Sequence, residues 1–435
     1  MGADDALSGA LAAKTGACQF PFMSLIRRLA GPLIKRGHIH LILPDGSRDT
    51  LGPGSGGEVT LRLTDRAALG QLVRKPRLAL GELYMDGRLV IEQGSMLDLL
   101  EIVVGSNPFE EGGKRGKTMM SKRGLSPLKK LFRRNKPAKS RQNVAHHYDL
   151  DDRLYDLFLD PWRQYSCAYF PDPGVGLDEA QRLKLAHIAA KLDLRAGQRV
   201  LDIGCGWGGL AIYLHRVAGV DVLGVTLSVE QLAYARAWAE REGVSDHVKF
   251  ELIDYRHVAG TFDRIVSVGM FEHVGAAHYD EFYAACSNLL SPDGVMLLHT
   301  IGKLGGAGGP DPFTDKWIFP GYHIPSLSQM ASSSEKARMI VSDVETLRLH
   351  YGTTLRHWLK RCEARRAEIV AIYDERFYRM WEFYLGGAIV MFESGAACNF
   401  QVQYIRSRRA LPITRDYIAE AEAKYRGPDL EPRSK

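Results

Sequence analysis

The stretch VLDIGCGWGG, residues 200–209, decides the fold. A short apolar run ends at Asp202, and three glycines follow at alternate positions, Gly204, Gly206 and Gly208. Glycine lets the backbone turn sharply and approach a ligand closely where a buried strand passes into a helix. The stretch therefore predicts a strand–turn–helix unit with a small-molecule site at the carboxyl end of the strand.

Strand and helix patterns alternate from residue 199 onward. Short runs rich in Val, Ile and Leu are separated by longer stretches with helical spacing. This alternation is typical of an α/β domain with a parallel sheet and helices on both faces. The expected strands are RVLDIG, VDVLGVT, HVKFEL, FDRIVSVG and GVMLLHTI. Further helices are expected at DEAQRLKLAHIAAKL, LRHWLKRCEARRAEIVAIY and RFYRMWEFYLGGAIVMFESG.

The glycine spacing distinguishes between two classes of nucleotide ligand. Dinucleotide-binding folds use G-x-G-x-x-G and place an acidic residue after the second strand, where it binds a ribose hydroxyl. Here the spacing is G-x-G-x-G, and Thr226 ends the second strand, with Gln231 five residues later. NAD is therefore disfavoured, and a structural turn without a ligand is the remaining alternative.

The chain of 435 residues is long enough for two or three domains. Residues 1–105 are expected to form a small α+β domain close to lipid, because HIHLILPDG and EVTLRL have strand patterns and MLDLLEIVV has a helical one. Residues 106–142 are expected to be a basic linker, and residues 143–435 a catalytic domain. Residues 304–330, rich in Gly, Pro and aromatic side chains, are expected to be an irregular lid or binding loop.

Charge and cysteine content limit the function classes. Residues 114–141 hold twelve Lys or Arg and no acidic residue, whereas the whole chain has a net charge of +6. Such a segment could contact nucleic acid or an anionic membrane, or could simply be an extended solvated linker. The six cysteines form no C-x-x-C pair, which disfavours a disulfide scaffold or a zinc site. We expect a cytoplasmic protein without a metal site or a membrane span.

Seven motifs in order resemble the cyclopropane-fatty-acyl-phospholipid synthase family, which is similar to the mycolic acid cyclopropane synthases. They are DIGCGWGG, GVTLSVEQ, YSCAYF (165–170), FEHVG (271–275), LLHTIG (297–302), FPGYHIPSL (319–327) and LRLHYGTTLRHW (347–358). The resemblance is strong over residues 140–405 and weaker over the N-terminal unit. It implies a Rossmann-like S-adenosylmethionine methyltransferase sheet with helical additions.

The resemblance also implies a pocket for S-adenosylmethionine. Gly204 and Gly206 would approach its methionine part through backbone, Thr226 and Gln231 would contact the ribose, and Tyr255 would face the adenine. The other implied cofactor contacts are Tyr165, Ser166, Asp202, Leu227 and Arg256.

The implied reaction transfers a methylene unit from S-adenosylmethionine to the cis double bond of an unsaturated phospholipid acyl chain. Ring closure requires a base that removes a proton from the added methyl group inside a dry site. In the family this base is a bound bicarbonate. The resemblance implies that it is held by the side chains of Glu272, His299 and Tyr351 and by backbone groups at or near Cys167, Gly269 and Ile301.

Without the resemblance, simpler interpretations of these side chains are favoured. Glu272 would cap or pair with a helix start, His299 would be a core histidine, and His273 is expected to be structural in either case. Relatives often carry a cysteine at the position of Ala388, so no cysteine nucleophile is expected here. An apolar acyl channel could be lined by aromatic residues, with plain core packing as the alternative. These are Phe319, Tyr322, Trp381, Phe383 and Tyr384.

Other products and partners stay open or are disfavoured. Methylation without ring closure would leave a methyl-branched unsaturated chain, and the motifs do not separate the two outcomes. A nucleic-acid methyltransferase is disfavoured because the chain lacks an Asn/Asp-Pro-Pro-aromatic motif, and a non-catalytic lipid scaffold is disfavoured because the pocket motifs are intact. The expected partner is an anionic phospholipid surface at the inner face of the membrane, contacted through the linker and SPLKKLFRRNK. A homodimer is an open alternative.

Overall fold

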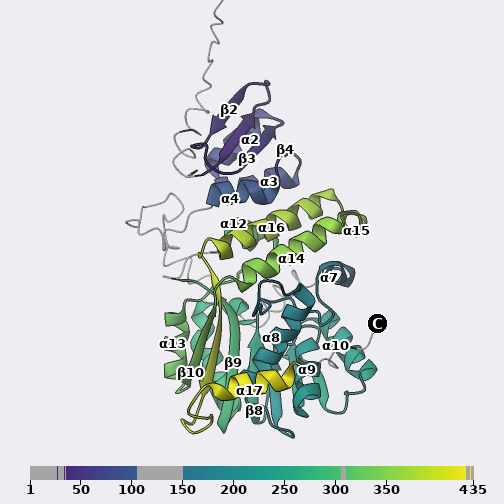
Figure 1. The fold of residues 1–435 in the computed structure, drawn as a ribbon, viewed down its shortest axis with the longest axis vertical. Helices are drawn as coiled ribbons and strands as arrows, with labels where there is room; N and C mark the ends of the chain where they lie inside the picture. Colours follow the sequence, from purple (N-terminus) through teal and green to yellow (C-terminus); the bar gives the residue numbers. More distant parts are fainter. Residues whose placement is uncertain are drawn as a thin grey trace, which may run out of the picture.

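The structure is a computed structural model that describes residues 27, 34, 36–104, 150–304, 310–427 and 432. A small N-terminal unit lies at one end, long helices lie in the middle, and a large sheet with its covering helices lies at the other end (Figure 1). The basic linker expected at residues 106–142, including SPLKKLFRRNK, lies outside the described residues.

The N-terminal unit has a four-stranded sheet of its own, in the order β2-β1-β3-β4. Its middle strands, β1 and β3, are parallel, and alternate residues of β3 (Val59, Leu61 and Leu63) point into the core. The α+β architecture expected for this unit is therefore confirmed. Its strands are β1 (His38–Ile42), β2 (Arg48–Leu51), β3 (Glu58–Leu63) and β4 (Leu89–Gln93), and its helices are α2 (Arg66–Arg74), α3 (Pro76–Met85) and α4 (Met96–Val104).

The large sheet has seven strands in the order β10-β11-β9-β8-β5-β6-β7. The five strands expected from the sequence are β5 (Arg199–Ile203), β6 (Asp221–Thr226), β7 (Val248–Leu252), β8 (Phe262–Val268) and β9 (Leu290–Gly302), and all are present. The expectation of a parallel sheet is wrong in one respect. Strand β11 (Cys398–Ile405) runs antiparallel to both of its neighbours, β9 and β10 (Ile340–Leu347). It thus inserts a reversed strand into an otherwise common doubly wound order.

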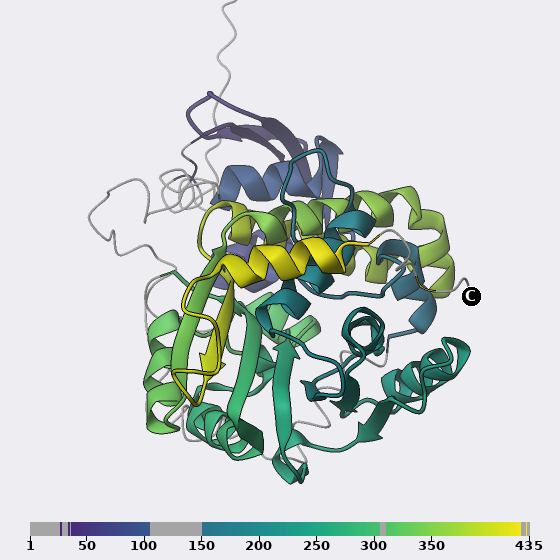
Figure 2. The same ribbon diagram turned by 60° about the horizontal axis from the view of Figure 1, so that its bottom comes forward.

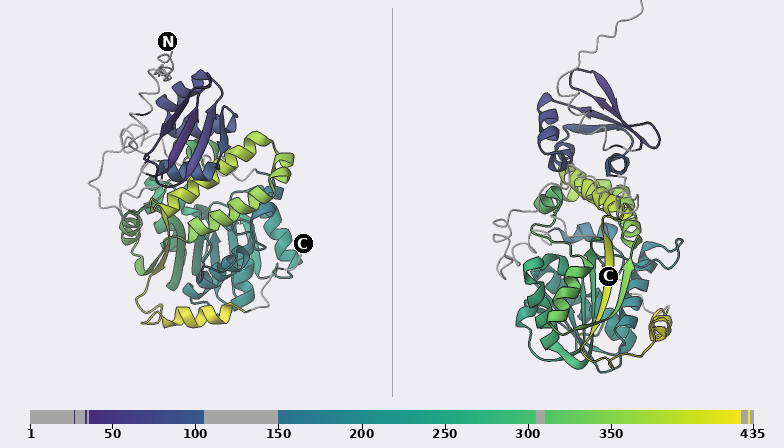
Figure 3. Two further views of the ribbon diagram at one scale, coloured as in Figure 1. Left: turned by 45° about the horizontal axis from the view of Figure 1, so that its top comes forward. Right: turned by 90° about the vertical axis from the view of Figure 1, so that its left-hand side faces the viewer.

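Helices cover both faces of this sheet, as expected, and each face has its own hydrophobic core (Figures 2 and 3). Alternate residues of one strand serve the two cores: Val200 of β5 belongs to one and Leu201 to the other. One face carries α8 (Leu177–Lys191), α9 (Gly209–Ala218), α10 (Val229–Arg241) and α17 (Asp416–Tyr425). The other carries α11 (Tyr279–Leu289) and α13 (Leu327–Lys336).

The helical layer joins the N-terminal unit to the sheet. It contains α7 (Asp152–Phe158), α12 (Pro312–Trp317), α14 (His350–Ala364), α15 (Arg366–Ile372) and α16 (Glu375–Glu393). Helices α3 and α4 pack on α16, and one hydrophobic core runs through both parts. Polar contacts cross the same boundary, because Tyr84 donates to Glu382 and Arg376 Nε donates to Asp86 Oδ1 at 2.9 Å.

Residues 304–330 were expected to be irregular throughout, but they contain helix α12 and the start of α13. Asp311 explains the start of α12, because its carboxylate accepts from the N–H groups of Phe313 and Thr314. Within the described residues, no helix combines the length and the apolar character that a bilayer crossing requires.

Candidate active site

The glycine-rich turn joins β5 to α9 and exposes backbone at the carboxyl edge of the sheet. Gly204 and Gly206 have φ of 80° and 54°, a conformation that favours glycine. A Cβ at Gly204 would lie 2.8 Å from Cβ of Met270, whereas a Cβ at Gly206 would meet no atom within 4 Å. The turn therefore needs glycine at position 204, and at position 206 it presents bare backbone to open space.

A cavity lies beside this turn and gathers most of the predicted cofactor residues. Thr226 at the end of β6 donates through Oγ1 to Gln231 Oε1 at 3.1 Å, which orients both side chains on the cavity wall. Arg256 pairs with Asp254 at 2.6 Å, beside Tyr255 in the short 3-10 helix η2 (Tyr255–His257). The predicted residues that line the cavity are Gly204, Gly206, Thr226, Leu227, Gln231, Tyr255, Arg256 and Gly269.

Three predicted cofactor residues do not line this cavity. Asp202 is buried in the preceding strand, and its Oδ2 has no hydrogen-bond partner within the described part of the chain. Burial raises the pKa of Asp202 to about 7, although the nearby Lys184 charge opposes this shift. Tyr165 stacks on Trp358 with ring centroids 5.1 Å apart, and Ser166 Oγ accepts from Lys184 Nζ at 2.9 Å. Tyr165 packs against the hydrophobic cluster of the helical layer, and Ser166 belongs to a buried polar contact with α8.

Sequence reasoning missed other residues of the cavity wall. His273, expected to be structural, lines the cavity, and burial lowers its pKa to about 4, so its ring is neutral at neutral pH. The expectation assumed the alternation of a strand, but residues Phe271–His273 form a 3-10 helix, η3, in which neighbours do not point to opposite faces. The other missed wall residues are Ile203, Val225, Ile253, Asp254, Val268, Met270, Val274 and His278.

Glu272 lies in η3, just beyond the end of β8, and its carboxylate reaches the next strand. Its Oε1 accepts from the backbone N–H of Ile301 on β9 at 2.6 Å, at a level where β8 has already ended. Glu272 Oε2 is buried without a hydrogen-bond partner among the described residues. Burial raises the pKa of Glu272 to about 7, although the bond from Ile301 opposes the shift. The carboxyl group can therefore gain or lose a proton near neutral pH.

His299 lies on β9, two residues before Ile301, and the N–H of Gly269 donates to its carbonyl oxygen at 2.9 Å. Both ring nitrogens have amide neighbours on β11: Nδ1 lies 3.1 Å from Gln401 Nε2, and Nε2 lies 3.2 Å from Asn399 Nδ2. Burial, reinforced by nearby positive groups that include Lys184 and Lys191, lowers the pKa of His299 far below its usual range. The ring is therefore a neutral imidazole held inside the protein.

Cys167 and Tyr351 approach from the helical layer. Cys167 is fully buried, and burial raises the pKa of its thiol, so it is a neutral group. Tyr351 on α14 packs against Phe392 with ring centroids 4.6 Å apart. Both residues share one hydrophobic cluster with Ile301. The predicted base-site residues thus fall into two sets. One lies at the strand ends (Glu272, Gly269, His299 and Ile301), and the other lies in the hydrophobic cluster of the helical layer (Cys167 and Tyr351).

The fold and the site together define the class of S-adenosylmethionine-dependent methyltransferases. The defining features are a doubly wound sheet with one reversed strand, a glycine turn after β5, and a cavity at the carboxyl ends of β5, β6 and β8. A crystal structure of the mycolic acid cyclopropane synthase CmaA1 complexed with SAH and CTAB matches this fold. The TM-score is 0.57 at 34% sequence identity, over 61% of this chain and 97% of that one.

Sequence comparisons give the family. The family described as Mycolic acid cyclopropane synthetase matches residues 135–402. A cyclopropane-fatty-acyl-phospholipid synthase of Escherichia coli K12 is 40% identical over 77% of this chain and 85% of its own length. A probable fatty acid methyltransferase of Pseudomonas putida is 34% identical over 88% of this chain and 98% of its own length. The chain belongs to the mycolic acid cyclopropane synthetase family.

Proposed function

We propose that this methyltransferase transfers a methylene unit from S-adenosylmethionine to the cis double bond of an unsaturated acyl chain in a phospholipid. The products are a cyclopropane acyl chain and S-adenosylhomocysteine. The observation that carries the proposal is the buried carboxyl group of Glu272, with one unpartnered oxygen among the described residues, beside the cofactor cavity. The name of the Escherichia coli relative supports the choice of substrate.

The proposed reaction balances as a methyl transfer followed by loss of a proton. The π electrons of the alkene bond to the sulfonium methyl carbon, the S–C bond breaks, and its electrons remain on sulfur in S-adenosylhomocysteine. A C–H bond of the added methyl group then breaks, its electrons close the ring, and a base takes the proton. The buried thiol of Cys167 stays protonated because burial raises its pKa, so it does not compete for the methyl group.

We assign the base to a bicarbonate held next to Glu272. The residues fit such a group, because Glu272 Oε2 is buried without a partner among the described residues, while the N–H of Ile301 holds the other carboxylate oxygen in place. Buried polar atoms of this kind call for a small polar ligand. When bound, bicarbonate would supply an acceptor for the proton lost in ring closure. Glu272 and Tyr351 would hold it by side chain, with backbone at Cys167, Gly269 and Ile301 around it. His299 was expected to hold it by side chain as well, but both of its ring nitrogens face amides of β11, so in this proposal it acts through them.

The acyl chain is assigned to the aromatic helical layer. His273 on the cavity wall meets Phe319 edge-on at 5.6 Å, and Phe319 meets Tyr384 at 6.0 Å. Tyr384 continues to Trp381 at 5.3 Å. This row of rings begins at the cofactor cavity and ends within α16, which suits an apolar chain that must bring its double bond to the sulfonium methyl group. Tyr322 and Phe383 are assigned to the same lining.

The membrane is the proposed source of the substrate. The basic residues of 106–142 would contribute about 1 kcal/mol each when close to an anionic surface. The proposal includes a cytoplasmic location and contact with the inner face of the membrane. It also divides the chain into an N-terminal domain (1–105), a basic linker (106–142) and a catalytic domain (143–435). Flotation with vesicles of neutral or anionic phospholipid tests the contact, because only anionic vesicles should carry the protein at low salt. Light scattering tests whether two chains associate.

A methyl-branched unsaturated product is the second candidate. The Pseudomonas putida relative, matched over 98% of its length, is described only as a probable fatty acid methyltransferase, so its name does not specify a ring. Purified protein, S-adenosylmethionine labelled in the methyl group and vesicles with cis-unsaturated acyl chains distinguish the two. The proposal expects label in acyl chains that have gained one CH₂ and lost the double bond. A labelled chain that keeps its olefin would support the branched product, and a chain without label would contradict both.

Bicarbonate is tested in the same assay. Turnover should fall in buffer freed of carbon dioxide and should return when bicarbonate is added, whereas chloride at equal ionic strength should not restore it. Equal turnover with and without carbon dioxide would contradict the assignment of the base and would leave the methyl transfer itself in place.

A further inference from the structure

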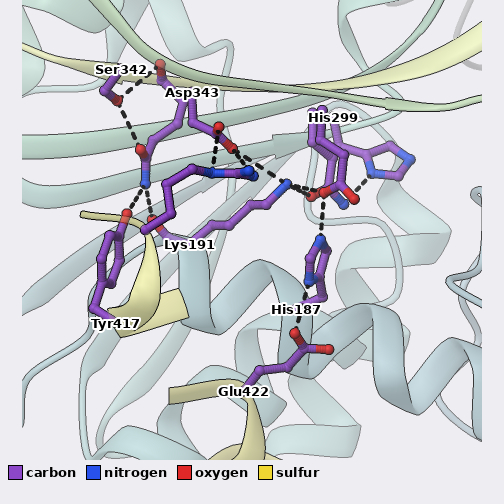
Figure 4. A network of polar contacts seen from close by, with 11 residues as sticks. His187, Lys191, His299, Ser342, Asp343, Tyr417 and Glu422 are labelled. Atoms are coloured by element: carbon purple, nitrogen blue, oxygen red, sulfur yellow. Dashed lines mark hydrogen bonds and ion pairs between the residues drawn. The ribbon is translucent and has the colours of Figure 1, made fainter. Parts of the chain in front are cut away.

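A buried polar network connects helix α8 to His299 (Figure 4). Lys191, at the end of α8, is fully buried and forms an ion pair with Glu345 on β10. Its ammonium also donates to Gln401 Oε1 at 2.9 Å, and Gln401 Nε2 lies 3.1 Å from His299 Nδ1. A single amide side chain therefore separates a buried charge from the imidazole of the base site.

Glu345 keeps Lys191 charged. His187 Nε2 lies 2.7 Å from Glu345 Oε2, and His187 Nδ1 lies 3.3 Å from Glu422 Oε2. Despite partial burial, the contacts with His187 and Lys191 hold the pKa of Glu345 well below its usual range. Asp343 adds a second carboxylate 3.9 Å from Lys191 Nζ. Burial lowers the pKa of Lys191, and the contacts with Glu345 and Asp343 oppose this shift. The ion pair with these carboxylates requires Lys191 to be an ammonium group.

The ammonium fixes the direction of the hydrogen bonds that follow it. An ammonium group has only donors, so Gln401 must turn its oxygen toward Lys191 and its NH₂ group toward His299. Nδ1 of His299 then accepts a hydrogen bond and carries no proton. Because the imidazole is neutral, its single proton must be on Nε2.

The Nε2–H group requires an acceptor, and Asn399 is its neighbour. With the nitrogen of the Asn399 amide toward the ring, two donors would face each other, and Asn399 Oδ1 is then buried without a partner among the described residues. Turning the Asn399 amide by 180° places its Oδ1 opposite the Nε2–H group of His299, so that this donor and this acceptor bind each other. The NH₂ group of Asn399 then occupies the buried position that Oδ1 had. Asn399 on β11 pairs with Ile301 on β9, and the N–H of Ile301 donates to Glu272.

We infer that Lys191, acting through Gln401, fixes His299 as the Nε2–H tautomer and thereby makes the Asn399 NH₂ group a further donor to the anion beside Glu272. Lys191 and Gln401 are positioning residues, because they act through His299. The role given to Asn399 rests on the proposed function, whereas the tautomer of His299 follows from the network alone.

The tautomer is measured in the full-length protein labelled with ¹⁵N-histidine. Long-range ¹H–¹⁵N correlations of the ring identify the protonated nitrogen, and the signals of His299 are those lost in a His299→Gln variant. We expect Nε2–H in the unaltered protein. In Gln401→Glu a carboxylate oxygen faces Nδ1, so the proton should move to Nδ1. An Nδ1–H ring in the unaltered protein, or an unchanged ring in Gln401→Glu, would overturn the inference.

Kinetics separate positioning from mere stability. Gln403 is the matched control, because it is a buried glutamine on the same face of β11, and it contacts the Lys191 carbonyl and Tyr417 instead of His299. We expect kcat to fall about 10- to 100-fold in Gln401→Glu, as for other groups that orient an active-site histidine. KM for S-adenosylmethionine should stay within twofold, and Gln403→Glu should keep kcat within threefold. Equal losses of kcat in the two variants would overturn the inference.

Asn399→Asp tests the last step of the network. The carboxylate still accepts from Nε2–H but cannot donate, so the tautomer should be retained while kcat falls at least tenfold. A retained tautomer with unchanged kcat would overturn the role of Asn399. Failure of the proposed function is distinguishable, because the unaltered protein would then place no label in acyl chains whatever tautomer His299 adopts.

Discussion

The two halves of the carboxyl edge of the sheet build their sites in different ways. Around β5, β6 and β7 the cofactor cavity is made from turns that follow directly on each strand, with bare backbone at Gly206 and the paired side chains of Thr226 and Gln231. Around β8, β9 and β11 the proposed base site depends on buried polar side chains from distant parts of the chain, such as Glu272 and Gln401. The geometry of the cofactor half therefore depends on local sequence, whereas the geometry of the base-site half depends on hydrogen bonds between distant parts of the chain.

The largest effect is expected on the base-site half, from Glu272→Gln. The amide keeps the size of the side chain but cannot exchange a proton, so kcat should fall about 100-fold or more, the range of general acid–base groups. S-adenosylhomocysteine affinity, measured by calorimetry, should stay within twofold because the cofactor half is unaltered. Glu335→Gln on the exposed surface of α13 is the control. Unchanged turnover in Glu272→Gln would remove Glu272 from the mechanism.

On the cofactor half, Gly204→Val should reduce S-adenosylhomocysteine affinity by about 10- to 100-fold. The new side chain has to adopt a positive φ, which costs about 1–3 kcal/mol, and its Cβ would press on Met270 at 2.8 Å. Gly243→Val is the matched control, because Gly243 also has positive φ (70°) but has no atom within 4 Å of its Cβ position. If both variants bind the cofactor equally well, the turn does not shape the pocket.

Buried carboxyl groups on both halves should make stability depend on pH. The pKa of Glu272 is raised from 4.5 to about 7, so between these values the folded state keeps a proton that the unfolded state has released. The free energy of unfolding therefore falls as pH rises through this window, by about 3 kcal/mol for this group. Asp202 acts with the same sign. Urea unfolding from pH 5 to pH 8 should show a smaller decline in Glu272→Gln than in the unaltered protein, and parallel declines would contradict the buried, neutral carboxyl group.

The smallest effect is expected from Ala388→Cys in α16. Ala388 packs against the hydrophobic core, and alkene methylation requires no covalent enzyme intermediate. Turnover on vesicles should stay within twofold. The unaltered protein should keep its turnover in the presence of thiol reagents, because the cysteines that the structure describes are buried. A tenfold gain in turnover would show that a cysteine at this position takes part in the reaction.

The same contrast explains what could be predicted from the sequence. The glycine turn and strands β5 to β9 were predicted because each is encoded by a local pattern of apolar and glycine residues. The family resemblance implied that Thr226, Gln231 and Tyr255 contact one ligand, and all three line the same cavity. Parallel strands bring such positions together regardless of the rest of the fold.

Strand β11 and its network were not predicted, and the reason is physical. The segment CNFQVQYI alternates polar and apolar residues as a half-exposed strand would, yet all eight residues are buried. Asn399 and Gln401 are tolerated inside because Lys191 and His299 satisfy them, and Lys191 itself lies on a helix whose buried charges hide any amphipathic pattern. These partners are separated by 100 to 210 residues, so no local pattern reveals them.

The most direct test of the central claim uses S-adenosylmethionine with a fully deuterated methyl group. Ring closure by proton loss from the transferred methyl group predicts that each modified acyl chain, analysed by mass spectrometry, retains two of the three deuterons and has no olefin. A chain that retains all three deuterons together with a double bond would contradict ring closure and would identify the enzyme as one that makes a methyl-branched chain.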